Sequence, residues 1–178
     1  NVDSATCVNK AFEVIEARWL FDVPSDKIDI VVHPQYLCHS LVEFKDGSII
    51  CELGTADMKR YTQYALFYPD RGVSPKGSFI DLFEKSIAFE KPPFDNFPCL
   101  GMGHDVIEKG GTMPAVFHGA DTTAVRAFMD KKIKFTDIPI IIQNTMDAHD
   151  IVNDPDLAAI LESEKWAEEY AQTLVQTS

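Results

Sequence analysis

Hydrophobic and polar positions alternate with helical spacing over the first part of the chain. Four apolar residues recur at intervals of three or four positions: Val8, Phe12, Ile15 and Trp19. This is the spacing of one face of an α-helix. Three candidate N-cap residues come just before this run: Asp3, Ser4 and Thr6. The pattern predicts a helix that begins near Val8 and ends near Phe21, before Pro24.

The next stretch is rich in β-branched residues and predicts strands. Residues 28–33 have the composition of a strand. Residues 36–44 and 48–53 flank Asp46-Gly47, which is a strong signal for a hairpin turn. A further short strand is expected at residues 86–89. Together these segments predict an antiparallel pair within a small mixed sheet.

Helical patterns return after the sheet. Asp57 is expected to open a helix that runs to about Phe67 and stops before Pro69. Residues 71–98 are rich in Gly and Pro and are interpreted as a connecting segment. Four helical segments follow, near 99–109, 114–130, 137–147 and 155–174. Gly110-Gly111 is expected to end the first of them.

The fold class predicted from these elements is α+β, followed by a helical bundle. Residues 1–72 form the α+β part, residues 73–98 a connecting arm, and residues 99–178 the bundle. A chain of 178 residues is long enough to bury a real core. Hydrophobic residues make up 46% of it, which excludes disorder as its main state.

Charge and hydropathy exclude two classes of partner. With 16 Lys and Arg against 28 Asp and Glu, the net charge is −12. Nucleic-acid binding needs a concentrated basic face, so a nucleic-acid partner is not expected. No apolar run approaches the thickness of a bilayer, so no membrane-spanning helix and no membrane partner are predicted.

The cysteines indicate a reducing compartment. The four of them lack Cys-x-x-Cys spacing: Cys7, Cys38, Cys51 and Cys99. They are interpreted as free thiols, because disulfide frameworks and zinc sites use characteristic spacings. The chain begins at Asn1 and shows no targeting segment, and we expect it to be part of a longer polypeptide.

Polar groups concentrate at the start of the first predicted helix. Asn9 and Glu13 are one turn apart, and Lys10 is three residues from Glu13, so the three side chains can converge. An ammonium and an amide near a helix start, with Ser4 close by, fit a phosphate group. Glu13 fits a hard divalent cation, although Mg²⁺ needs more oxygens than one carboxylate supplies. On spacing alone, an ordinary solvated Lys–Glu pair is the favoured interpretation.

Two histidines flank the start of the predicted hairpin. His33 and His39 are six residues apart, which places them on one face of a continuous strand, but Pro34 favours a break. His33 is interpreted as structural. His39 fits a structural role and a role in phosphate binding or proton transfer equally well. The turn that ends at Met58 is of a common strand-to-helix kind and by itself indicates no site.

Longer motifs carry a resemblance to a known family. The first are Asp3-Ser4-Ala5-Thr6, Asn9-Lys10, Glu13 to Phe21, His33-Pro34-Gln35, His39-Ser40, Asp46-Gly47-Ser48, Asp57-Met58 and Tyr68-Pro69-Asp70-Arg71. The later ones are Phe97-Pro98-Cys99-Leu100, Gly110-Gly111-Thr112, Pro114-Ala115-Val116 and Phe135-Thr136-Asp137-Ile138. In this order, over nearly the whole chain, they resemble 1-deoxy-D-xylulose 5-phosphate reductoisomerase.

The resemblance implies a specific reaction. Enzymes of this family convert 1-deoxy-D-xylulose 5-phosphate, a phosphorylated sugar, to 2-C-methyl-D-erythritol 4-phosphate in the non-mevalonate isoprenoid pathway. The carbon skeleton rearranges first and NADPH then delivers a hydride, with Mg²⁺, Mn²⁺ or Co²⁺ as the divalent metal. The resemblance further implies a homodimer in the bacterial cytoplasm or the plastid stroma. Residues 1–72 would be the second half of the catalytic and dimerisation domain.

The resemblance also assigns roles to residues. Four are expected to contact the substrate: Ser4, Asn9, Lys10 and His39. Ser4 and Asn9 would lie at the phosphate, and Glu13 would bind the metal and act in catalysis with Lys10 and His39. Met58 is expected near the nicotinamide and the substrate. A dinucleotide-binding domain and an Asp-x-Glu pair that completes the metal site are not in this sequence, so the chain alone is expected to be inactive. The alternative is a non-catalytic phosphate-binding or interaction module derived from the family.

The sequence departs from the family pattern in four places, one of which is the unusual segment Lys59-Arg60-Tyr61-Thr62. Ala56 replaces the proline of a Pro-Asp-Met motif. Gly119-Ala120-Asp121-Thr122 replaces Ala-Ala-Asn-Glu, and Leu100-Gly101-Met102-Gly103 replaces Leu-Lys-Leu-Ala. Each glycine inside the predicted helix costs about 1 kcal/mol relative to alanine.

Overall fold

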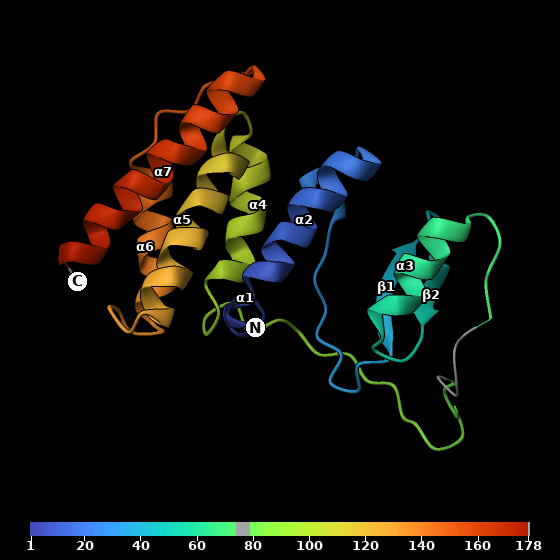
Figure 1. The fold of residues 1–178 in the computed structure, drawn as a ribbon. Coiled ribbons are helices and arrows are strands. Elements are labelled where there is room, and N and C mark those ends of the chain that lie inside the picture. Colours follow the sequence, from blue (N-terminus) through green and yellow to red (C-terminus); the bar gives the residue numbers. More distant parts are fainter. Residues whose placement is uncertain (74–78, 178) are drawn as a thin grey trace. The chain divides into compact units, whose positions relative to one another are not determined.

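The computed structural model describes residues 1–73 and 79–177. Its contacts divide the chain into two units (Figure 1). Residues 1–30 and 92–178 form the first, which we call the helical unit, and residues 31–91 form the second, the hairpin unit. The division expected from sequence lay near residues 72 and 98, whereas the contacts place residues 1–30 with the C-terminal helices. Residues 74–78 of the predicted arm lie outside the described part.

Six α-helices and one 3₁₀ turn make up the described helical unit. They are α1 (Val2–Thr6), α2 (Val8–Phe21), η1 (Ser25–Lys27), α4 (Cys99–Lys109), α5 (Met113–Met129), α6 (Asp137–Asp147) and α7 (Leu157–Thr177). The four helices predicted after residue 98 are confirmed to within about three residues at each end. Gly110, at φ 65°, ends α4 as expected. Within residues 1–73 and 79–177, no helix is long and apolar enough to span a membrane.

The helix predicted from Val8 to Phe21 is confirmed as α2, but the expected N-cap residues do not cap it. Asp3, Ser4 and Thr6 do not cap it but form α1, and Cys7, in the left-handed conformation at φ 64°, separates α1 from α2. The Thr6 hydroxyl donates back to the carbonyls of Val2 and Asp3, both at 3.2 Å. The N-cap position of α2 falls on Cys7, one residue after Thr6, and no side chain of the described residues caps this helix.

The core of the helical unit lies around α5. Its largest fully buried side chains are Phe117, Met113, Ile138, Ile142 and Met146. Helix α5 packs on α6 and α7, and α2 packs on α4. Small residues allow the closest approach: a Cβ at Gly119 would lie 2.5 Å from the Glu164 carbonyl oxygen of α7. The apolar face of α2 is therefore part of this core, which explains why residues 1–30 belong to the helical unit.

The hairpin unit contains the predicted antiparallel pair. Strands β1 (Cys38–Glu43) and β2 (Ile49–Leu53) are joined by the expected turn, in which Gly47 adopts φ 82°. A bulge shifts the register between Cys38 and Ser40. The helix predicted from Asp57 is confirmed as α3 (Met58–Phe67), and the Asp57 carboxylate caps it by accepting from the Lys59 N–H at 3.0 Å.

Two predicted strands were wrong. In place of strands at residues 28–33 and 86–89, the described chain has a single antiparallel bridge between Val32 and Glu90. Prolines bound both segments, with Pro34 after the first and Pro92 after the second. A proline lacks the N–H that a strand ladder requires, so pairing does not extend past these positions.

Candidate functional site

Four of the predicted site residues lie together where α1 meets α2. Ser4 is on α1, and Asn9, Lys10 and Glu13 are on α2; we call these four the α1–α2 polar cluster. All four are exposed, whereas Val8, Ala11 and Val14 on the opposite face of α2 are buried. The same periodicity that buries one face of α2 therefore presents the polar cluster on the other.

Two side-chain contacts order the cluster. The Asn9 Nδ2 amide donates to Ser4 Oγ at 2.9 Å, and the Lys10 ammonium donates to both Glu13 carboxylate oxygens at 2.7 Å. Because Ser4 Oγ accepts from Asn9, its own O–H can still donate to a ligand. The left-handed turn at Cys7 brings the end of α1 to the start of α2, which makes the first contact possible.

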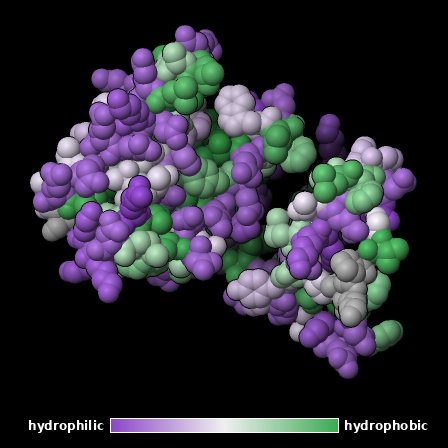
Figure 2. All heavy atoms as spheres, viewed as in Figure 1, coloured by the Kyte–Doolittle hydropathy of each residue, from purple (hydrophilic) through white to green (hydrophobic). Residues whose placement is uncertain are grey.

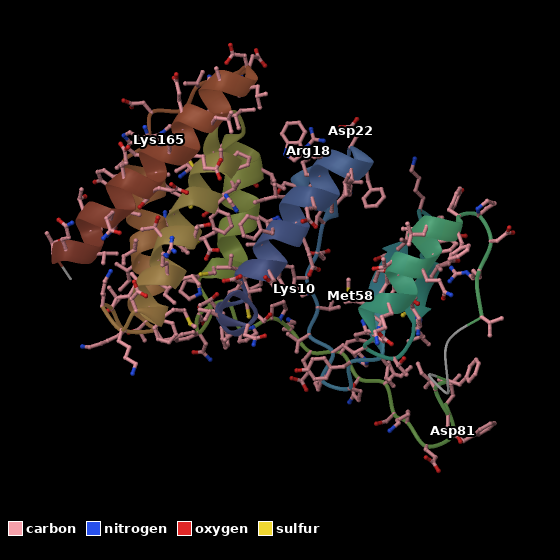
Figure 3. All side chains as sticks on the ribbon, viewed as in Figure 1. Lys10, Arg18, Asp22, Met58, Asp81 and Lys165 are labelled. Atoms are coloured by element: carbon pink, nitrogen blue, oxygen red, sulfur yellow. The ribbon has the colours of Figure 1, made fainter. Side chains whose placement is uncertain are left out.

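The Lys10–Glu13 pair is open to exchange. Its side chains are 52% and 55% exposed, and surface pairs of this kind contribute only about 0–1 kcal/mol. A metal ion could therefore displace the ammonium from Glu13 at little cost. Figure 3 shows Lys10 at the N-terminal end of α2, where the positive end of the helix dipole favours anions.

The metal site cannot be built from the described residues alone. Among residues 1–73 and 79–177, no three His, Cys, Asp or Glu side chains are grouped so as to hold a metal ion. Glu13 fits a divalent cation as a single oxygen ligand, since its carboxylate is exposed and its bonded partner is displaceable.

His39 and Met58 belong to the hairpin unit. The Nε2 atom of His39 lies 2.9 Å from the Gly54 carbonyl oxygen, so Nε2 carries a proton and donates. Nδ1 is then the nitrogen left to accept from a ligand in the neutral ring. Met58 is the first residue of α3 and is exposed (Figure 3), so its thioether can contact an apolar or aromatic group.

His33 has the structural role predicted for it. Its Nδ1 donates to the Ala88 carbonyl oxygen at 2.8 Å, and its ring lies 5.2 Å from the Phe89 ring. This histidine therefore holds the two segments of the Val32–Glu90 bridge together.

A polar network around Glu52 was not predicted. The Glu52 carboxylate accepts from Arg60 at 2.6 Å and from the Tyr61 hydroxyl at 2.8 Å, which ties α3 to β2. Burial, followed by the bond to Glu52, raises the pKa of Tyr61 to about 12. The Tyr61 ring also lies against His39, at 5.8 Å between ring centroids. Such a network leaves no periodic pattern in the sequence, because it spans a strand, a turn and a helix.

A buried carboxyl group in the helical unit was also missed. Asp121 on α5 is 6% exposed, and its Oδ1 atom has no hydrogen-bond partner among the described residues. Burial, then the nearby Asp3, raises the pKa of Asp121 to about 7, while His118 opposes the rise. The signal was available, since Asp121 lies one turn from Phe117 and Ala124 on the apolar face of the predicted helix.

Two surface hollows are lined by residues other than the predicted site residues. One, of about 540 Å³, is lined within the hairpin unit by Arg60, Arg71 and Tyr64 among others. The second, of about 610 Å³, lies in the helical unit beside Lys131 and Lys134. The α1–α2 polar cluster is an exposed surface of the helical unit and lines neither hollow.

Comparison with known proteins decides the family. The model of the DXP reductoisomerase C-terminal domain matches residues 53–170, about two thirds of the chain. The chain belongs to the DXP reductoisomerase family. The resemblance found in the sequence is thereby confirmed, and so is the α+β fold class.

Relatives within the DXP reductoisomerase family match almost the entire chain. The 1-deoxy-D-xylulose 5-phosphate reductoisomerase of Acetivibrio thermocellus is 46% identical over 98% of this chain and 46% of its own length. That of Trichlorobacter lovleyi is 44% identical over 99% of this chain and 45% of its own. The chain therefore spans about half the length of the curated relatives that it matches.

Solved structures of DXP reductoisomerases share the fold. The Zymomonas mobilis enzyme in complex with NADPH has a TM-score of 0.92 and 37% identity, over 99% of this chain and 47% of its own. A DOX-P reductoisomerase in complex with NADPH, fosmidomycin and magnesium has a TM-score of 0.89 and 35% identity, over 98% of this chain and 45% of its own.

Proposed function

We propose that this chain is the C-terminal portion of an NADPH-dependent reductoisomerase. It would take part in converting 1-deoxy-D-xylulose 5-phosphate to 2-C-methyl-D-erythritol 4-phosphate. The observation that carries the proposal is the α1–α2 polar cluster, exposed and internally bonded in a chain of this family. A purely structural module has no physical need to hold such a set of groups at a solvent-exposed helix start.

The cluster suits a phosphate group. Ser4 would donate its hydroxyl hydrogen, and Asn9, which is already bonded to Ser4 at 2.9 Å, would hold that hydroxyl in place. Lys10 would supply the positive charge from the first turn of α2. Fixed donors of this kind bind the substrate in one orientation, which lowers the entropic cost of reaching the transition state.

Glu13 would serve as one ligand of the divalent metal. When bound, such a metal acts as a Lewis acid on the oxygens of the substrate. With Glu13 as a metal ligand, the Lys10 ammonium would be free to bind the substrate. Since the described residues provide one suitable carboxylate here, we propose that the chain alone does not turn over and that residues outside it complete the site.

The hairpin unit would contribute the remaining contacts. His39 would contact the substrate through Nδ1, because Nε2 is bonded to Gly54. Met58 would lie near the nicotinamide and the substrate. Residues 1–72 would belong to the catalytic and dimerisation domain, and the exposed apolar side chains of β1 and β2 support a homodimer. The bacterial relatives favour the bacterial cytoplasm over a plastid.

The metal-ligand role of Glu13 is the point to test. In a complete enzyme that carries this chain, Glu13→Gln should lower the affinity for Mn²⁺, measured by electron paramagnetic resonance, by more than about 100-fold. NADPH oxidation should fall with it. Glu16→Gln is the matched control, since Glu16 is an exposed carboxylate on the same helix without a predicted role.

The outcomes separate the proposal from its alternative. If Glu13→Gln folds as the unmodified enzyme does, by circular dichroism, and loses metal affinity while Glu16→Gln keeps it, the assignment stands. Unchanged Mn²⁺ affinity and turnover in Glu13→Gln would remove Glu13 from the site. Absence of NADPH oxidation in the unmodified enzyme, with substrate and metal present, would favour a non-catalytic module.

A further inference from the structure

Two thiols meet on the hairpin. The Cys38 Sγ atom lies 2.8 Å from the Cys51 Sγ atom, and both side chains are half-buried. A disulfide bond is about 2.05 Å long, so the two sulfurs are within ~0.8 Å of bonding distance. Both cysteines are free in the structure. The pair is separate from the α1–α2 polar cluster, which lies in the helical unit.

The strand register explains why these sulfurs meet. Cys38 pairs with Leu53, and Cys51 pairs with Leu41, so Cys38 and Cys51 are diagonal neighbours on one face of the hairpin. The bulge at His39 adds one residue to β1 between these pairs. A bulge increases the local twist of a hairpin, which turns a diagonal pair toward each other.

We propose that Cys38 and Cys51 are a redox modification site that forms a reversible disulfide when it meets a low-molecular-weight disulfide such as oxidised glutathione. One of the two cysteines, as its thiolate, attacks one sulfur of the oxidant and releases one glutathione thiolate, which leaves a mixed disulfide on that cysteine. The other cysteine then attacks the protein sulfur of this mixed disulfide and releases the second glutathione. The two protein thiol protons pass to the two released thiolates, and the oxidant is reduced to two thiols.

The geometry supports the second step. The two sulfurs lie 2.8 Å apart in the reduced pair, so either cysteine is within reach of a mixed disulfide on the other. Burial, then its hydrogen bond to Cys51, raises the pKa of Cys38 to about 11, which disfavours the Cys38 thiolate.

The disulfide would restrict His39, which is a predicted substrate contact. Cys38 directly precedes His39, whose Nε2 bonds to Gly54 immediately after β2. A disulfide would join β1 to β2 at this end of the hairpin and restrict both partners of that bond. Oxidation would therefore fix the position of His39 without occupying any group in the polar cluster.

Trypsin offers a direct measurement. Lys45 lies in the exposed turn between the two cysteines, so cleavage there and at Lys27 and Lys59 places Cys38 and Cys51 on different peptides. The full chain is equilibrated with mixtures of reduced and oxidised glutathione, unfolded in iodoacetamide, digested and analysed by mass spectrometry. We expect peptides 28–45 and 46–59 to be recovered as one linked species that separates on reduction.

Variants test the mechanism. In Cys38→Ser and in Cys51→Ser the remaining cysteine of the pair should stop at a glutathione adduct, and neither variant should form the linked species. Cys7→Ser and Cys99→Ser are the matched controls, because these thiols lie in the helical unit, and both should still form the linked species. Recovery of Cys38 and Cys51 as alkylated thiols, as two stable glutathione adducts, or in disulfides between separate chains would each overturn the proposal.

Discussion

The two units of this chain differ in how far they bury their apolar side chains. In the helical unit, α5 and its neighbours bury a continuous core that includes Phe117 and Ile142, both fully inaccessible to solvent. In the described hairpin unit the one buried large apolar side chain is Leu37. Val42, Ile49 and Ile50 on its strands are more than half exposed. Figure 2 shows hydrophobic side chains at the surface among hydrophilic ones.

This difference indicates where the stability of the chain lies. A single two-stranded hairpin is marginally stable in water at best, because it buries too little surface to offset its loss of conformational entropy. The hairpin unit relies instead on polar links, such as that between Glu52 and Arg60. The α1–α2 polar cluster lies on the helical unit, which contains the buried core. A site that must keep a fixed geometry is best placed on such a rigid unit.

The largest effect should come from removing a core side chain. Phe117→Ala should lower the free energy of unfolding by about 3–5 kcal/mol, because Phe117 is fully buried and leaves a cavity. Phe83→Ala, in the hairpin unit, should change it by less than about 0.5 kcal/mol, since Phe83 is fully exposed. Urea unfolding followed by circular dichroism measures both. Similar losses in the two variants would contradict the contrast between the units.

The next effect concerns the buried Asp121 and depends on pH. Its pKa of about 7 in the folded chain exceeds the ordinary value of 3.8, so folding takes up a proton between these two values. The stability that this proton provides is complete below about pH 4 and is lost as pH rises through 7. Asp121→Asn keeps the group neutral, and at pH 8 it should be more stable than the unmodified chain by up to about 4 kcal/mol.

Urea midpoints at pH 8 and pH 4 test the Asp121 prediction. The advantage of Asp121→Asn should shrink as pH falls, because the unmodified Asp121, which faces Asp3, His118 and Cys99, becomes neutral as well. Asp105→Asn, at an exposed carboxylate on α4, is the control and should show no such pH dependence. A gain for Asp121→Asn that is the same at both pH values would argue against titration of Asp121.

Much of the fold could be predicted because its signals are local. Asp46-Gly47 specifies a hairpin through the positive φ that glycine allows, and the helices after residue 98 follow from apolar periodicity. The break at Cys7 could not be predicted, since a non-glycine residue in the left-handed conformation has no sequence signature. The single Val32–Glu90 bridge was missed because it joins segments far apart in sequence.

The candidate site likewise has contacts that could be predicted from the sequence and contacts that could not. The Lys10–Glu13 contact follows from three-residue spacing on a helix, and the structure contains it. The Ser4–Asn9 bond depends on the turn at Cys7, and the Cys38–Cys51 contact depends on the bulge at His39. Both require a backbone irregularity that composition does not reveal. The roles of these residues toward substrate and metal stay predictions that rest on the family.

The smallest of the three effects separates two glycines that looked equivalent in sequence. Both Gly101 and Gly103 lie on α4 and should cost about 1 kcal/mol each relative to alanine. A Cβ at Gly103 would lie 2.7 Å from the Ala11 carbonyl oxygen of α2, whereas a Cβ at Gly101 would have no neighbour within 4 Å. Gly103→Ala should therefore destabilise the chain by about 1–3 kcal/mol. Gly101→Ala should stabilise it by about 0.5–1 kcal/mol. Urea unfolding measures the change in stability of both variants. A change of the same sign in both would contradict the close contact between α2 and α4 at Gly103, which joins the helix that carries the polar cluster to the core.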